Sequence, residues 1–168
     1  LLNALLDDDR AIVSEIAGTT RDTIEDETTI GGVRFRFIDT AGIRETVDEI
    51  ETIGITKAFE KAGKASIVLY LVDAMETEVD DIAPAIQKIR DKIGEDQELI
   101  LIANKVDKAR DPIEVEAKFA GLPETVVISA TDGLGLEALR ERLIQASKSI
   151  LVEGSEVVVT NVRHYDAL

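Results

Sequence analysis

The stretch Leu99-Ile100-Leu101-Ile102-Ala103-Asn104-Lys105-Val106-Asp107 joins an apolar run to residues suited to recognising a nucleobase. A short apolar run of this kind is typical of a buried parallel strand, so we expect its polar successors where the strand ends. Guanine presents an N1–H and a 2-amino group that adenine lacks, and the carboxylate of Asp107 can accept from both. The amide of Asn104 is suited to tying the base loop together, and the aliphatic stem of Lys105 can cover a flat ring.

Two further motifs stand in an order that supports this interpretation. Asp39-Thr40-Ala41-Gly42 follows a run that ends at Ile38, and Ser129-Ala130-Thr131 follows another short apolar stretch. An aspartate at a strand end can hold a magnesium ion through water, and Gly42 lets a backbone N–H approach a terminal phosphate. The serine–alanine pair is expected to support the guanine ring through the backbone. Each motif alone also fits an ordinary turn, but together they indicate a guanine-nucleotide site.

Two candidates lie outside these motifs. Thr19-Thr20 follows a glycine in a loop-like stretch, and a hydroxyl there can complete magnesium coordination when a triphosphate is bound. Turn chemistry is the alternative, because Gly-Thr-Thr is common in loops. Glu51 lies in the first turn of a helix expected over about residues 49–61, and its carboxylate could orient an attacking water. The alternative for Glu51 is a first-turn acid that stabilises the helix N-terminus.

Composition excludes several classes of protein. The chain has 168 residues, no cysteine and a formal net charge of −15. The missing thiols exclude disulfides, thiolate metal sites and cysteine nucleophiles, and we expect a cytoplasmic protein. The negative charge disfavours direct contact with a phosphate backbone, so bound nucleotide must be held by local N–H groups, a lysine and metal ions. No apolar run is long enough to span a membrane.

The order of apolar patterns predicts an α/β fold. Strands are expected over 23–30 and 33–38 around a Gly31-Gly32 hairpin turn, and then over 66–72, 99–103 and 125–128. Between and after the later strands come helical patterns, including the stripe Ile82, Ile86, Ile89 and Ile93 and a last helix over 136–148. This alternation predicts a mostly parallel sheet with helices on both faces and one antiparallel hairpin at its edge. Residues 1–150 form the expected domain, and residues 151–168 an exit segment with a short β-prone run, Val157-Val158-Val159.

The motifs resemble those of a known family. Ala17-Gly18-Thr19-Thr20-Arg21-Asp22, Asp39-Thr40-Ala41-Gly42-Ile43-Arg44-Glu45 and Asp48-Glu49-Ile50-Glu51-x-x-Gly54-Ile55 resemble the G domain of the MnmE (TrmE) tRNA-modification GTPases. These belong to the TrmE-Era-like P-loop GTPases. The resemblance runs essentially from end to end, and the third segment is the most specific part of it. Related GTPases of ribosome assembly share the first two motifs, so they remain an alternative.

The resemblance implies roles for individual residues. Thr20 matches a magnesium-binding threonine, and Glu51 matches the catalytic glutamate that orients water. Ser14, Ile16 and Thr19 match a loop that coordinates potassium, largely through backbone carbonyls, where the ion replaces an arginine finger. The implied nucleotide-contacting and metal-contacting residues are Ser14, Glu15, Ile16, Ala17, Gly18, Thr19, Thr20, Asp39, Thr40, Ala41, Gly42, Asn104, Lys105, Val106, Asp107, Ser129, Ala130 and Thr131.

The resemblance also implies a setting. The family hydrolyses GTP with Mg²⁺ and K⁺, works as a homodimer whose G domains approach each other, and modifies the wobble uridine of tRNA with the flavoprotein MnmG. The glycine-rich phosphate loop, which the family carries just before the helix with which this chain opens, does not occur in the 168 residues. We therefore expect a domain without its first strand and phosphate loop. A degenerate G domain that binds partners without hydrolysis is a further alternative.

Overall fold

A computed structural model describes residues 1, 4–5, 25–38, 65–122, 125–150 and 157–163, and structural statements below concern this part of the chain. The helix expected over 49–61 lies outside it. The elements in chain order are β1 (Glu25–Ile30), β2 (Val33–Ile38), β3 (Ile67–Asp73), α3 (Val79–Arg90), β4 (Glu98–Asn104), the 3-10 turn η1 (Val106–Lys108), α4 (Pro112–Phe119), β5 (Thr125–Val127), α5 (Leu136–Ile150) and β6 (Val157–Arg163).

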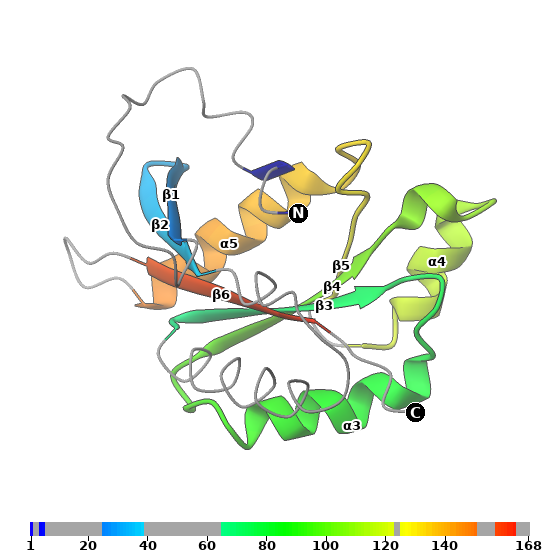
Figure 1. The fold of residues 1–168 in the computed structure, drawn as a ribbon, viewed down its shortest axis with the longest axis horizontal. Helices are drawn as coiled ribbons and strands as arrows, with labels where there is room; N and C mark the ends of the chain where they lie inside the picture. The colour runs from blue at the N-terminus through cyan, green and yellow to red at the C-terminus, as the bar shows by residue number, and fades with distance from the viewer. Residues whose placement is uncertain (2–3, 6–24, 39–64, 123–124, 151–156, 164–168) are drawn as a thin grey trace, which may run out of the picture.

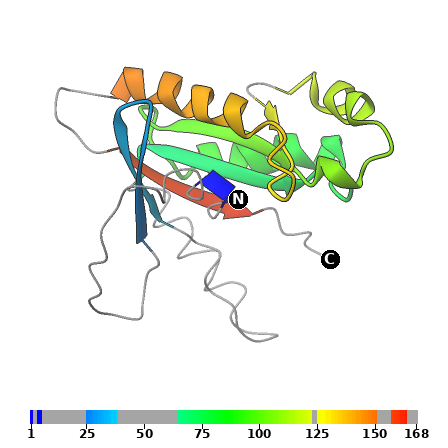
Figure 2. The same cartoon turned by 90° about the horizontal axis from the view of Figure 1, so that it is seen from above.

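The six strands form one sheet in the order β1-β2-β6-β3-β4-β5. Only β1 and β2 pair antiparallel, while β2–β6, β6–β3, β3–β4 and β4–β5 are parallel. Figure 1 shows α5 on one side of the strands and α3 on the other. Figure 2 shows β6 beside β3 and the β1–β2 hairpin at the end of the sheet. The predicted fold class, a mostly parallel sheet covered on both faces with a hairpin edge, is confirmed.

The hairpin turn follows from its two glycines. Gly31 and Gly32 have φ of 58° and 82°, and a two-residue turn with positive φ at both positions matches the twist of the flanking strands. A Cβ at Gly31 would lie 2.5 Å from Cδ1 of Ile144 on α5, so the turn also lies close against that helix.

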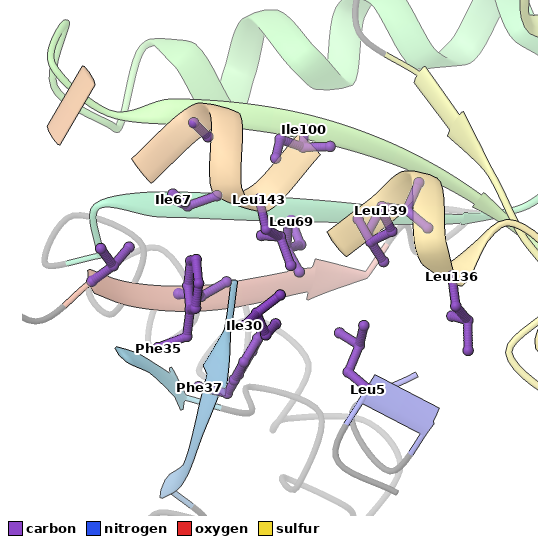
Figure 3. Packing of buried hydrophobic residues seen from close by; sticks show 14 of the residues in the cluster. Leu5, Ile30, Phe35, Phe37, Ile67, Leu69, Ile100, Leu136, Leu139 and Leu143 are labelled. Carbon is purple, nitrogen blue, oxygen red and sulfur yellow. The ribbon is translucent and has the colours of Figure 1, made fainter. Parts of the chain in front are cut away.

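Two apolar clusters lie on opposite faces of the sheet. Strand residues such as Phe35, Leu69 and Ile100 pack against Leu139 and Leu143 of α5 (Figure 3). The opposite cluster joins other residues of β3 and β4 to the buried stripes of α3 and α4. Residues of β3 and β4 alternate between the clusters, as successive side chains of a strand must. The members buried in the second cluster from the helices are Ile82, Ile89, Val115 and Phe119.

The segment expected to leave the domain contributes a central strand. β6 lies between β2 and β3 in parallel with both, and Val159 pairs with Phe37 on one side and Ile67 on the other. Val157 and Val159 are fully buried, which suits alternating β-branched residues in a sheet covered on both faces. The sequence indicated only a β-prone run at 157–159, and the domain boundary at residue 150 stays a prediction.

Among the described residues, no helix has the length and apolarity needed to cross a bilayer.

Candidate functional site

The predicted site falls into two parts. The segment 14–20, the motif 39–42 and Glu51 lie outside the described residues, so their arrangement and roles stay predictions. The residues predicted to recognise the base, 104–107 and 129–131, are described, and the structure brings them together at one edge of the sheet.

The parallel ladder of β3 and β4 sets the position of this edge. Asp73 and Asn104 are register partners at the last residues of the two strands, and the N–H of Ala74 donates to the carbonyl of Asn104 over 2.8 Å. In parallel α/β sheets the carboxyl ends of the strands are where ligands bind, because loops there can be varied without disturbing the core.

Asn104 ties the two halves of the base loop. Its Oδ1 accepts a hydrogen bond from the backbone N–H of Ala130 over 3.1 Å. The N–H of Ile128 donates to the carbonyl of Ala103 over 2.8 Å, which continues the contact between β4 and β5. The Asn104 side chain thus joins the two predicted motifs, as its short amide was predicted to do.

Val106 fixes the loop after β4 to the hydrophobic core. Its side chain is buried within the cluster that contains α4, and its N–H donates to the carbonyl of Ile128 over 3.2 Å. A buried residue at this point holds the flanking Lys105 and Asp107 at the surface, where both are exposed. The contribution of Val106 is therefore to fix the backbone, and its side chain faces the core.

Asp107 is oriented by the hydroxyl of Ser129. Ser129 Oγ donates to Asp107 Oδ1 over 2.7 Å and accepts from the N–H of Asp132 over 3.1 Å. Ser129 is fully buried, so its hydroxyl is held within the protein. Oδ2 of Asp107 has no hydrogen-bond partner among the described residues. A carboxylate held by one oxygen and open at the other is prepared to accept a pair of donors.

A tight loop supports Ser129. Its N–H donates to the carbonyl of Leu134, and its carbonyl accepts from the N–H of Gly133, both over 2.9 Å. Gly135 has φ of 73°, and a Cβ there would lie 2.2 Å from the carbonyl oxygen of Val127. Only glycine fits this position, which closes the loop before α5 begins. Within this loop Thr131 is exposed.

Asp73 is a member of this edge that the sequence analysis missed. Its Oδ2 lies 2.5 Å from Nζ of Lys105, and its Oδ1 accepts from the N–H of Met75 over 3.0 Å. Burial alone raises the pKa of the Asp73 carboxyl, but the bonds from Lys105 and Met75 and the charges of Lys105 and Lys108 outweigh it, so the pKa lies below its usual value of 3.8. The sequence could have indicated Asp73 as a site residue, because it ends the apolar run of β3 as Asn104 ends that of β4.

The described edge can select a planar heterocycle with two adjacent donors. Asp107 offers acceptors, Lys105 offers a stem that can lie on a ring face, and Asn104 and Ser129 fix the loops on which these stand. Adenine would leave the carboxylate unpaired, which costs more than the bond itself contributes. The chemistry therefore fits guanine.

Metal binding concerns the other end of the nucleotide. Among the residues that the structure describes, no group of three or more histidine, cysteine, aspartate or glutamate side chains could hold a metal ion. The predicted ligands Thr20, Asp39, Ser14, Ile16 and Thr19 all lie outside the described ranges.

The chain is similar in sequence to known GTPases. The family model described as 50S ribosome-binding GTPase matches residues 1–105. The tRNA modification GTPase MnmE of Christiangramia forsetii is 48% identical over 100% of this chain and 38% of its own length. The MnmE protein of Flavobacterium psychrophilum is 47% identical over 100% of this chain and 36% of its own length. The chain thus spans somewhat more than a third of the length of these relatives.

Solved structures share the fold. Era in complex with MgGDPNP and nucleotides 1506–1542 of 16S ribosomal RNA is 27% identical with a TM-score of 0.62, over 93% of this chain and 53% of that one. Aquifex aeolicus Era bound to GDP and AlF4− is 28% identical with a TM-score of 0.63, over 92% of this chain and 53% of that one. The chain is similar along its whole length to the tRNA modification GTPases MnmE. The match over residues 1–105 shows that the chain belongs to the family of GTP-hydrolysing enzymes described as 50S ribosome-binding GTPase.

Proposed function

We propose that this chain carries potassium-stimulated GTP hydrolysis that drives modification of the wobble uridine of tRNA. The observation that carries the nucleotide assignment is the Asp107–Ser129 hydrogen bond of 2.7 Å, which leaves one carboxylate oxygen open toward a base. Support for the biological role comes from relatives named tRNA modification GTPase, which match the whole chain at 48% and 47% identity.

In this proposal the base is recognised by the described edge. Asp107 accepts from N1–H and the 2-amino group of guanine, and the stem of Lys105 covers one face of the ring. Asn104 and Ser129 hold the two loops, and the backbone around Ala130 and Thr131 borders the base.

The phosphate groups of the nucleotide are proposed to be bound by residues that lie outside the described part of the chain. Thr20 and, through water, Asp39 are the proposed magnesium ligands, and Ser14, Ile16 and Thr19 the proposed potassium ligands. The two cations neutralise charge on the phosphates when bound. The remaining lining of this end comprises Glu15, Ala17, Gly18, Thr40, Ala41 and Gly42. Glu51 orients the water that attacks the γ-phosphate in line.

The proposed partners follow from the same resemblance. A second copy of the protein brings its G domain to this one, and an MnmG-type flavoprotein joins the modification reaction. The net charge of −15 disfavours contact between this acidic chain and tRNA, so we assign tRNA binding to other parts of the cytoplasmic complex.

The test measures GTP hydrolysis by the full-length protein in buffers that contain either K⁺ or Na⁺ at equal ionic strength. We expect faster turnover in K⁺, and we expect Glu51→Ala to lower kcat strongly with GTP affinity nearly unchanged. Equal loss of turnover and affinity in the variant would contradict the role of Glu51. Equal rates in the two salts would contradict the potassium assignment.

A ribosome-assembly GTPase is the second candidate. The family description names 50S ribosome binding, and Era was solved with 16S ribosomal RNA. Deletion of the gene separates the two: loss of the modified wobble nucleoside from bulk tRNA supports the first function, and accumulation of ribosomal precursors with normal tRNA supports the second. A chain that binds GDP but hydrolyses no GTP in either salt would be a degenerate interaction module.

A further inference from the structure

The ion pair between Asp73 and Lys105 links the base loop to the neighbouring strand. Asp73 is held by its own loop, since its Oδ1 accepts from the N–H of Met75 over 3.0 Å. Its Oδ2 lies 2.5 Å from Nζ of Lys105, which is about half exposed, with 47% of its side-chain surface accessible. The carboxylate is therefore the fixed partner, and the pair contributes to fixing the position of the lysine side chain.

The backbone at Lys105 has an uncommon conformation. Lys105 has φ of 72°, the only positive value among the described non-glycine residues. This conformation is costly for a residue with a Cβ, and it occurs where the surroundings fix it. It directs the lysine out of β4 at the point where Val106 turns into the core. A lysine stem samples many rotamers unless its ammonium is held, and that freedom has to be given up on contact with a ligand.

A role in holding β3 to β4 does not explain the pair. The two strands already share a parallel ladder that pairs each residue from Ile67 to Asp73 with one from Glu98 to Asn104. The Ala74 N–H bond to the Asn104 carbonyl extends this contact beyond the last pair. An ion pair with one half-exposed partner adds little to strands joined in this way.

We propose that Asp73 is a positioning residue for guanine-nucleotide binding, which holds the Lys105 ammonium so that the aliphatic stem stands ready to cover the face of the base. The proposal rests on the guanine site proposed above. It adds a residue of β3 to a site otherwise built from β4 and the loop after β5, and it assigns the residue to ordering the ligand-free site.

The experiment measures dissociation constants of a fluorescent GDP analogue for the full-length protein. Asp73→Asn keeps an Oδ1 that accepts from Met75 but removes the charge opposite Lys105. Lys105→Met keeps an aliphatic stem but removes the ammonium. We expect Asp73→Asn to weaken binding about three- to fivefold. In the Lys105→Met background the same change should alter affinity by less than about 1.5-fold, because its partner is already gone.

Controls separate this inference from the guanine site itself. Glu76→Gln changes an exposed acid of the same loop and should leave affinity unchanged. Asp73→Glu keeps the charge and should recover part of the affinity. If Asp107→Asn weakens GDP binding but Asp73→Asn does not, the inference is wrong and the site stands. Equal weakening by Asp73→Asn in both backgrounds also overturns it, since Asp73 would then act without Lys105.

The site itself fails under a different result. If Lys105→Met and Asp107→Asn both leave GDP affinity unchanged, the proposed guanine site is wrong and the inference falls with it. Thermal unfolding of each variant shows whether a loss of affinity reflects a loss of folded protein.

Discussion

Replacing Asp107 with asparagine should convert guanine recognition into xanthine recognition. Ser129 Oγ donates to Oδ1 over 2.7 Å, and the Oδ1 of an asparagine can accept the same bond. That bond fixes which end of the amide faces the protein, so Nδ2 takes the open position of Oδ2. Oδ1 can still accept from the N1–H that guanine and xanthine share, but Nδ2 is a donor that opposes the 2-amino group of guanine and pairs with the 2-oxo group of xanthine.

The magnitude follows from the bonds lost. A hydrogen bond to a charged group contributes about 1.5–3 kcal/mol, and leaving the 2-amino donor unpaired against Nδ2 costs about 1–3 kcal/mol more. The total is about 2.5–6 kcal/mol, or about a hundred- to ten-thousandfold in GDP affinity. Fluorescence titration of the full-length protein with GDP and XDP measures this. Asp132→Asn is the matched control, because only its backbone N–H contacts Ser129 and its side chain is exposed. A folded Asp107→Asn protein that keeps GDP affinity, or binds neither diphosphate, would refute the reasoning.

Further changes test the loop and the core. Ser129→Ala removes a buried hydroxyl that joins two groups, and it should lower the free energy of unfolding by about 1–3 kcal/mol and GDP affinity about tenfold, measured by urea unfolding and titration. Gly135→Ala should destabilise by more than about 2 kcal/mol in the same assay because its Cβ would overlap a backbone carbonyl, whereas Gly133→Ala, with open space around it, should cost about 1 kcal/mol. Leu139→Ala in the fully buried face of α5 should cost about 2–5 kcal/mol, while Ile113→Ala, 72% exposed, should cost under about 0.5 kcal/mol.

Most elements of the fold could be predicted from residues close together in the sequence. The Gly31-Gly32 turn is decided by the backbone preferences of the residues themselves and occurs as predicted. The same kind of preference starts α4 at Pro112, where Asp111 Oδ1 accepts from the N–H of Ile113. The position of the proposed base-recognition residues could also be predicted, because a polar residue after a buried strand must emerge at the carboxyl edge of the sheet. Asn104 is placed there as the last residue of β4, and Asp107 follows in η1.

Contacts between distant segments were less accessible. The residues around Asp73 in the sequence do not predict its ion pair with Lys105, because that pair depends on the register between β3 and β4. Likewise, Val157-Val158-Val159 indicates a strand but not its neighbours, because the same alternation fits an edge or a centre. Pairing on both sides, with β2 and with β3, depends on space left between elements far away in the chain.

The central position of β6 has a measurable consequence. β2 and β3 do not pair directly, so β6 joins the hairpin to the rest of the sheet, and its Thr160 hydroxyl also donates to the carbonyl of Ile38 over 3.2 Å. Amides of a strand paired on both edges open only with the core, so hydrogen exchange over 157–163 in the full-length protein should be as slow as over β3 and β4. Exchange many orders of magnitude faster than in β4 would contradict this placement, because the amides of β6 would then lack the ladders on either side. Such a result would mean that β6 does not join the hairpin to β3. The continuous parallel sheet would then consist of β3, β4 and β5, which carry the proposed base-recognition residues.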